Sequence, residues 1–179
     1  MAVYVLLLRA IGPGTHAKMS MAALRKGLED AGFEDVTTVG NTGNVICWSP
    51  RSAAQVRTTA QKAVDGFGIR SEVFVRTPRR MASVVKANPF PDAVEDHPSH
   101  VGVCSFHEAP SWKGLEAYKG PMRWTSSGPH LIRDAGRDAA GIGQFNVEKL
   151  AGATMTERNW RVFATLAEKA AALPRTRRS

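Results

Sequence analysis

Two features are scarce in this chain of 179 residues, and each absence excludes a class of protein. Cysteine occurs only at Cys47 and Cys104, both in apolar segments, which excludes a disulfide scaffold and favours reduced thiols in a cytoplasmic protein. No apolar run reaches the roughly 18 residues that a membrane helix needs, and no basic segment precedes the apolar run 3–8. We therefore expect no membrane partner and no signal segment, and residues 3–8 to form a buried strand.

Negative charge is scarce as well. The chain has 24 Lys and Arg against 16 Asp and Glu, a net charge of +8. Residues 1–90 hold 12 basic against 6 acidic residues, whereas residues 91–179 hold 12 against 10. The later excess comes from Arg175, Arg177 and Arg178, in a basic tail that we expect to be frayed and solvated. Such a charge favours anionic partners, although many basic proteins never contact nucleic acid.

The spacing of apolar residues predicts an α+β fold. Strands at 3–8, 36–39, 45–48 and 72–75 alternate with helices that start at Met21 and Ala53. This order, β-α-β-β-α-β, is typical of a ferredoxin-like domain. Thr77 and Pro78 then begin a third helix as a good N-cap and first residue, and Asn88-Pro89 ends it. We assign residues 1–90 to this N-terminal half.

A linker rich in proline and acidic residues, 90–98, leads to a second α+β half, 91–179, which we expect to pack against the first. The pattern predicts a strand at 101–106, a short helix from Trp112, two strands around Ser126-Ser127-Gly128 and a helix near 145–150. This is a partial echo of the first half without an evident sequence repeat. Thr154 and Glu157 have the spacing of a capping box, which predicts the start of the long C-terminal helix.

An ordered set of motifs resembles the bacterial DUF1697 family, a domain of unknown function. The motifs are Leu6-Leu7-Leu8-Arg9, Gly12-Pro13-Gly14 with Lys18, Thr42-Gly43-Asn44-Val45, Val75-Arg76-Thr77, Ala87-Asn88-Pro89-Phe90, and 154–160. The chain departs from the family pattern at 10–14 and at 39–41. The resemblance implies an α+β fold with ferredoxin-like character, and it brings no established activity, cofactor or catalytic residue.

Several basic and amide side chains are candidate ligand-binding residues. Arg9 and Lys18 flank the glycine turn 12–14, which could hold an anion through backbone amides, although it lacks the ending of a P-loop. Asn41 and Asn44 lie in the hairpin 40–44, whose simpler interpretation is a turn that requires positive φ. Arg158 and Asn159 could contact a phosphate or a domain interface, while Trp160 belongs to the core.

The strongest candidate is the cluster Arg76, Arg79 and Arg80. Cations in the first turn of a helix oppose its dipole at a typical cost of about 0.3–1 kcal/mol each, which suggests that an anion binds there. The alternative is that these arginines extend into solvent. Because we expect the first and third strands to be parallel and the fourth to run against them, we expect the hairpin to lie at the same end of the sheet as Arg76. Arg9 is then expected at the opposite end, about 17 Å away.

Histidine and cysteine gather between residues 97 and 107 without a metal-binding spacing. His100 and Cys104 share a strand face but lie about 13 Å apart, and His107 points to the other face. We therefore expect no metal. Neither cysteine has a base or a helix N-terminus beside it in the sequence, and no cofactor is indicated.

These features favour a cytoplasmic protein that binds phosphate-bearing ligands, with nucleic acid as one such class, through Arg76, Arg79, Arg80 and the hairpin. The strands lack the aromatic pairs on which RNA-recognition domains stack bases, since Tyr4 and Phe74 are the only candidates. The alternative is an enzyme or regulator of a small anionic metabolite, with Arg9, Lys18, Arg158 and Asn159 in a cleft between the halves. A homodimer formed through the sheet is a third possibility. The sequence leaves open whether the protein is an enzyme.

Overall fold

The computed structural model describes residues 1–139 and 145–173, and the chain divides into two compact units. Unit 1 is Met1–Ala82 with Leu166–Ser179, of which 166–173 are described, and unit 2 is Ser83–Thr165. The basic tail residues Arg175, Arg177 and Arg178 lie outside the described residues. Within the described ranges, no helix is both long and apolar enough to cross a membrane.

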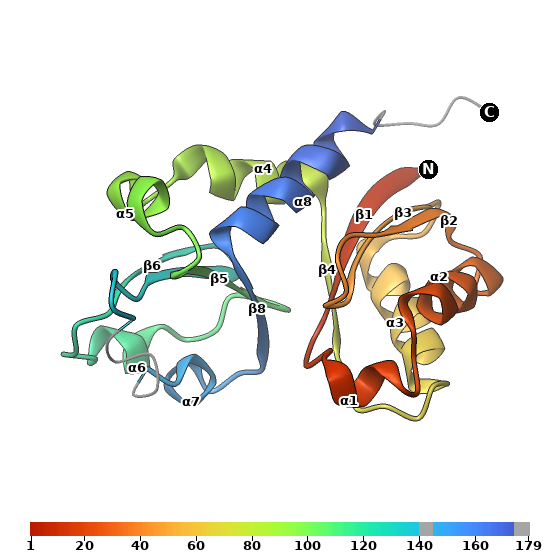
Figure 1. Ribbon diagram of the computed structural model, residues 1–179, viewed down its shortest axis with the longest axis horizontal. Coiled ribbons are helices and arrows are strands. Elements are labelled where there is room, and N and C mark those ends of the chain that lie inside the picture. The colour runs from red at the N-terminus through yellow and green to blue at the C-terminus, as the bar shows by residue number, and fades with distance from the viewer. Residues whose placement is uncertain (140–144, 174–179) are drawn as a thin grey trace. The chain divides into compact units, whose positions relative to one another are not determined.

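Unit 1 contains a four-stranded sheet with two main helices on one face (Figure 1). Its strands follow the order β2-β3-β1-β4, and every neighbouring pair is antiparallel. This is the ferredoxin-like arrangement that the sequence predicts. Its elements are β1 (Ala2–Leu8), α1 (Pro13–His16), α2 (Met21–Asp30), β2 (Glu34–Thr38), β3 (Asn44–Ser49), α3 (Ala53–Asp65) and β4 (Val73–Arg76).

The apolar run of β1 is explained by burial on both faces of the sheet. Tyr4, Leu6 and Leu8 face α2 and α3, where they join one core. Side chains alternate along a strand, so Val5 and Leu7 point to the opposite face, where they are also buried. The two helices begin at Ser20 and Ser52, whose hydroxyl groups accept hydrogen bonds from backbone N–H groups of the first turn.

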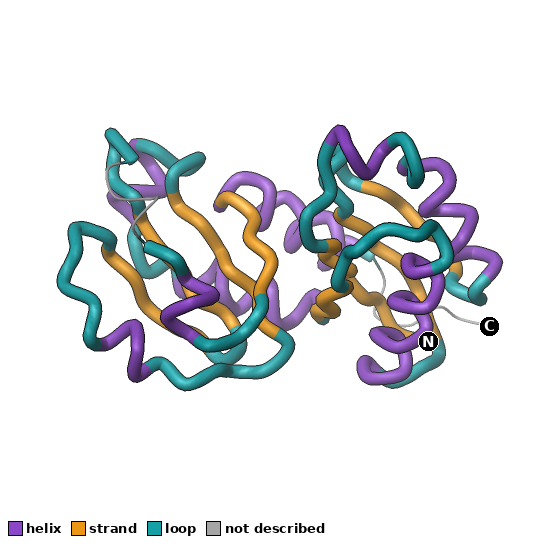
Figure 2. Tube along the Cα trace, turned by 90° about the horizontal axis from the view of Figure 1, so that it is seen from below, coloured by secondary structure: helices purple, strands orange, loops and turns teal. Residues whose placement is uncertain are grey.

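Unit 2 contains a second antiparallel sheet, with order β6-β7-β5-β8. Figure 2 shows its strands in orange and the connecting loops in teal. Leu115, Val147 and Ala151 pack against Cys104 and Leu131 on one face of this sheet. The elements after β4 are α4 (Pro78–Ala87), α5 (Pro91–Asp96), β5 (Val101–Phe106), α6 (Lys113–Glu116), β6 (Arg123–Ser127), β7 (His130–Asp134), α7 (Val147–Ala151), β8 (Met155–Asn159) and α8 (Trp160–Ala172).

The two sheets share their strand order and also their register. In unit 1, Val5 lies between Ile46 and Arg76 on the neighbouring strands. In unit 2, Val103 lies in the same way between Ile132 and Arg158. One loop contact repeats too: Leu8 N donates to Gly43 O at 2.8 Å, and Phe106 N donates to Pro129 O at 2.9 Å. The second half therefore repeats the strand order of the first half and the register around its central strand.

Two sequence predictions in unit 2 are wrong. Residues 91–96 form α5, where the proline and acidic content predicted a linker. Thr154 and Glu157 do not cap a helix, because residues 155–159 form β8 and pair with β5. The cap of α8 is Asn159, whose Oδ1 accepts from Val162 N at 3.0 Å.

Candidate functional site

The start of α4 separates the three arginines that the sequence groups together. Arg76 is buried, pairs with Val5 in the sheet, and donates from Nη1 to Val75 O at 2.7 Å. Burial, and secondarily the positive charge of Arg80, lowers the pKa of Arg76 to about 10. Arg79 and Arg80 are exposed in the first turn of the helix. The cluster is thus one buried cation and two exposed cations.

The backbone of this helix start is largely satisfied by Thr77. Its Oγ1 accepts from Arg80 N at 3.3 Å, and its carbonyl accepts from Met81 N at 3.2 Å. Pro78 has no N–H group. A phosphate cradle made of several backbone amides is therefore not available, and anion binding here depends on side-chain charge and the helix dipole.

A cavity of about 360 Å³ opens beside this helix start, within unit 1. Arg79 is the only charged residue among the described residues of its wall, and Thr77 supplies a hydroxyl group. Small apolar side chains from β1, α4 and α8 make up most of the rest. The lining residues are Ala2, Val3, Thr77, Pro78, Arg79, Ala82, Ala170, Ala171 and Leu173. The volume lies within the range of small-molecule pockets, roughly 300–1,000 Å³.

The hairpin lies beside Arg9, and the predicted grouping of the hairpin with Arg76 is wrong. Since β1 and β3 are antiparallel, Asn44 pairs with Leu7 near the end of β1. The next residue after that strand, Arg9, donates its N–H to Glu72 O at 2.9 Å, at the same end of the sheet. Arg76 instead pairs with Val5. The prediction failed because it treated the first and third strands as parallel.

The remaining candidates in unit 1 have local roles. Asn44 is buried and donates from Nδ2 to Val39 O and Thr42 Oγ1, at 3.1 Å each, so it braces the turn. Asn41 is exposed, and its carbonyl lies 2.8 Å from His16 Nε2. Lys18 is also exposed, with Nζ 3.5 Å from Gly68 O. These contacts support the interpretation of residues 40–44 as a structural turn.

Arg158 and Asn159 in unit 2 correspond to Arg76 and Thr77 in unit 1: each pair is a buried arginine at the end of a strand followed by the N-cap of a helix. Arg158 is buried, and its Nη1 donates to Glu157 O at 2.8 Å and to Thr156 Oγ1 at 2.9 Å. Burial lowers the pKa of Arg158 to about 10, against the opposing effect of Glu157. Asn159 caps α8 as Thr77 caps α4. The signal for this repeat is a short pattern, Arg-Thr-Pro-Arg at 76–79 and Arg-Asn-Trp-Arg at 158–161.

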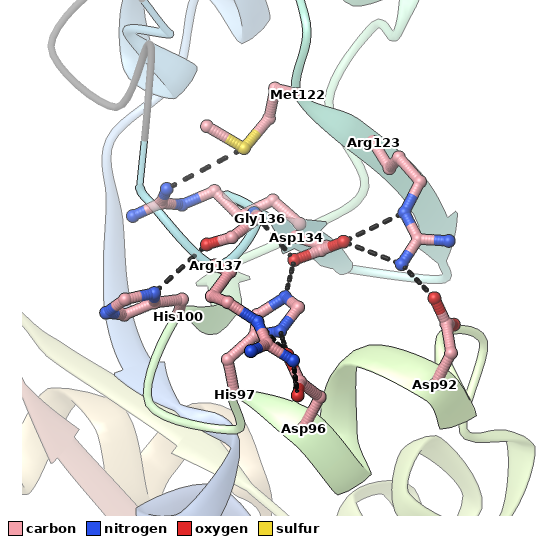
Figure 3. Close-up of polar contacts among 10 residues, drawn as sticks. Asp92, Asp96, His97, His100, Met122, Arg123, Asp134, Gly136 and Arg137 are labelled. Carbon is pink, nitrogen blue, oxygen red and sulfur yellow. Dashed lines mark hydrogen bonds and ion pairs between the residues drawn. The ribbon is translucent and has the colours of Figure 1, made fainter.

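A polar network around Asp134 in unit 2 was missed by sequence reasoning (Figure 3). The buried carboxylate of Asp134 lies 2.8 Å from His97 Nε2 and accepts from Arg123 Nε and Gly136 N, also at 2.8 Å. His97 Nδ1 contacts Asp96 at 2.7 Å, and Arg137 also binds Asp96. The network ties α5 to β7. Because its members come from separate elements, no local spacing indicates it.

The histidines and cysteines near residue 100 are engaged in other contacts. His100 Nδ1 lies 3.0 Å from Gly136 O, and Cys104 Sγ donates to Glu157 Oε2 at 3.5 Å. Burial raises the pKa of Cys104 well above its usual value, and it raises the pKa of Cys47 to about 12. In residues 1–139 and 145–173, no three His, Cys, Asp or Glu side chains are grouped as metal ligands.

The network gives unit 2 a pH-dependent stability. Hydrogen bonds to Asp96 and Asp134 raise the pKa of His97 above 6.5. A raised histidine pKa contributes stability that is fully present below the unfolded value and is lost as pH rises through the folded value. We expect urea unfolding to show stability that declines as the pH rises above about 6.5, the ordinary pKa of histidine, and through the raised pKa of folded His97. His97→Gln should remove this decline, and an equal slope in both proteins would contradict the assignment.

Comparison with known proteins gives a family and a fold. A family model described as "Protein of unknown function (DUF1697)" matches residues 1–125. A solved structure, that of conserved bacterial protein SP0830 from Streptococcus pneumoniae, is similar with a TM-score of 0.73 and 19% sequence identity. The match covers 96% of this chain and 99% of that chain. A search of curated proteins finds no match.

Proposed function

Since the chain belongs to the DUF1697 family of proteins of unknown function, its role must come from its own geometry, and we propose that it binds a small anionic ligand in the cavity beside α4. The ligand class is a phosphate or carboxylate group on an apolar body. The cavity, with Arg79 as the charged residue among the described residues of its wall, carries this proposal. Both cysteines are free and buried, in keeping with the cytoplasmic setting that we propose.

The wall of the cavity offers a contact for the anionic group of such a ligand and another for its apolar body. Arg79 offers a forked donor to an oxyanion, and charge-assisted hydrogen bonds of this kind are stronger than neutral ones. A cation in the first turn of α4 opposes the helix dipole, and a bound anion would relieve that opposition. The alanines at 2, 82, 170 and 171 leave room for an apolar group.

A small ligand suits these observations better than nucleic acid does. Arg76 is buried, so only two arginines of the basic cluster, Arg79 and Arg80, are exposed at this helix start. Tyr4 and Phe74, the aromatic candidates for base stacking, are both buried. Tyr4 also donates its hydroxyl to Arg51 O at 2.7 Å. Neither ring is available as a stacking platform.

The test is a thermal-shift screen of phosphorylated and carboxylated metabolites on the full chain. A true ligand should raise the melting temperature progressively as its concentration exceeds its dissociation constant. For such a ligand, Arg79→Ala is expected to weaken binding by roughly tenfold to a hundredfold, the loss of one charged hydrogen bond. Arg80→Ala is the matched control, because Arg80 is the exposed neighbour outside the cavity wall.

Two outcomes would contradict this proposal. One is a screen in which no compound stabilises the protein, and the other is an equal loss of binding in the two variants. Labelled single-stranded RNA and DNA at about 50 and about 200 mM salt form the comparison arm. If RNA or DNA binds with a steep dependence on salt and both variants weaken that binding, the ligand is a polyanion and not a small molecule.

A further inference from the structure

The cavity beside α4 has two polar side chains in its described wall, and both offer hydrogen-bond donors. The guanidinium of Arg79 has no hydrogen-bond or ion-pair partner among the described residues. Thr77 Oγ1 accepts from Arg80 N at 3.3 Å, and within the described part of the chain nothing accepts the hydroxyl hydrogen of Thr77. The polar end of a ligand in this cavity therefore has to accept hydrogen bonds from a guanidinium and a hydroxyl group.

The charge of the wall matches a carboxylate more closely than a phosphate. A carboxylate carries one negative charge, and its two oxygen atoms accept parallel hydrogen bonds from one guanidinium. A phosphate monoester carries about −1.5 to −2 charges at pH 7 and has three acceptor oxygens. Arg79 is the only charged residue in the described part of the wall, so it balances the charge of a carboxylate but not that of a phosphate.

The backbone of the helix start adds little to these donors. Pro78 has no N–H group. The N–H groups of Arg80 and Met81 already donate to Thr77, through its Oγ1 and its carbonyl oxygen. A phosphate would thus lack the set of backbone amides that usually surrounds it, whereas Arg79 and Thr77 suffice for a carboxylate.

The rest of the wall is apolar and consists mostly of small side chains. Ala2 comes from β1, Ala82 from α4, and Ala170 and Ala171 from α8. No aromatic side chain lies in the described part of the wall, so nothing there stacks on a flat ring. At about 30 Å³ for each group of the size of a water molecule or a methylene, a volume of about 360 Å³ holds about twelve such groups.

We propose that the cavity binds a monocarboxylic acid with an aliphatic chain of about eight to ten carbons. This inference rests on the anion-binding function proposed above for the same cavity and names its ligand class. Arg79 binds the carboxylate as a fork, Thr77 donates a third hydrogen bond, and the alanines contact the chain. The small side chain of Ala171 is a determinant of chain length.

The first experiment measures the binding of saturated monocarboxylic acids of about four to about twelve carbons to the full chain by calorimetry. Each added methylene should tighten binding roughly fourfold, because it buries more apolar surface, until the cavity is full at about ten carbons. The uncharged amide of the acid that binds best should bind roughly tenfold more weakly, since it loses the charge-assisted hydrogen bond to Arg79. The monoalkyl phosphate of equal chain length should also bind more weakly than the acid.

Substitution of Ala171 tests the apolar part of the wall. Ala171→Leu fills part of the cavity, and the acid that binds best should become shorter by about three carbons, the number that leucine adds to alanine. Ala172→Leu is the matched control, because Ala172 is the exposed neighbour on the same helix and lies outside the described wall. Both variants should fold, since alanine and leucine are both good helix formers.

The outcomes distinguish this inference from the proposed function on which it rests. Binding that tightens with chain length, requires the carboxylate and prefers a shorter acid only in Ala171→Leu supports the inference. If alkyl phosphates bind more tightly than the acids, or if chain length has no effect while Arg79→Ala still weakens binding, the ligand class is wrong and the anion-binding cavity stands. If no acid binds, the inference is overturned, and the thermal-shift screen decides independently whether the cavity binds another anion.

Discussion

Gly43→Ala is expected to lower the free energy of unfolding by about 3 kcal/mol. Gly43 has a φ of +75°, which an L residue adopts at a cost of about 1–2 kcal/mol. A Cβ there would also lie 2.7 Å from both Leu8 Cβ and Ile11 Cγ1. Relieving that overlap requires movement of β1, at about 1–3 kcal/mol for overpacking.

Gly40→Ala is the matched control in the same turn. Its φ is +68°, but no atom lies within 4 Å of the position that an added Cβ would take, so only the backbone cost of about 1–2 kcal/mol applies. Urea denaturation of both variants measures the difference. Equal losses would contradict the prediction, because they would show that the protein accommodates the added Cβ of Gly43→Ala without strain against Leu8 and Ile11.

Much of the fold was accessible from the sequence because its elements have strong local patterns. The unbroken run of β1 and the helical stripes of α2 and α3 follow directly from burial periodicity. Turns were also predictable from local sequence: glycine in the hairpin 40–44 predicted a positive φ, and Gly43 has a φ of +75°. Local patterns therefore predicted most elements of unit 1 and their order.

The errors arose where non-local pairing decides the structure. Residues 155–159 alternate between partly buried and buried positions, as a strand does, but Thr154 and Glu157 also match a capping motif. Pairing with β5 decides between the two, and the sequence does not display that pairing. The misplaced hairpin has the same origin, because the relative direction of β1 and β3 is a property of the sheet.

The candidate site residues were predicted by type but not by orientation. The sequence pattern predicted a helix start near Arg76 and near Arg158. We expected both side chains to be exposed and available to a ligand. Both are buried and donate to the carbonyl of the preceding residue. The repeat that explains them keeps Val, Ile and Arg in equivalent rows. Most other positions differ, which is why the repeat escaped notice.

A substitution of Glu157 distinguishes the strand that the structure shows at residues 155–159 from the helix cap that the sequence motif predicted. In the structure its carboxylate binds Arg133 through Oε1 at 2.6 Å and through Oε2 at 3.0 Å. Gly102 leaves room for this pair, because a Cβ there would collide with Glu157 Oε1. The two side chains are only 12% and 28% exposed, so the pair is poorly solvated. An uncharged partner would leave the Arg133 cation uncompensated.

We therefore expect Glu157→Gln to destabilise the protein by roughly 2–3 kcal/mol, somewhat less than a fully buried pair would lose. A capping box accepts Gln as well as Glu, so a cap at Glu157 would lose little. Asp30→Asn is the surface control, since Lys26 and Asp30 are 74% and 64% exposed, and it should lose far less stability than Glu157→Gln.

The double variant Arg133→Met with Glu157→Leu separates loss of charge from loss of packing. Replacing both members of a poorly solvated ion pair by apolar residues is often neutral or stabilising, because it also removes the desolvation penalty. We expect the double variant to recover most of the stability that Glu157→Gln loses, measured by urea denaturation at neutral pH. A double variant that is less stable than Glu157→Gln would contradict this expectation. It would show that apolar side chains cannot replace the ion pair in the space beside Cys104 and Gly102.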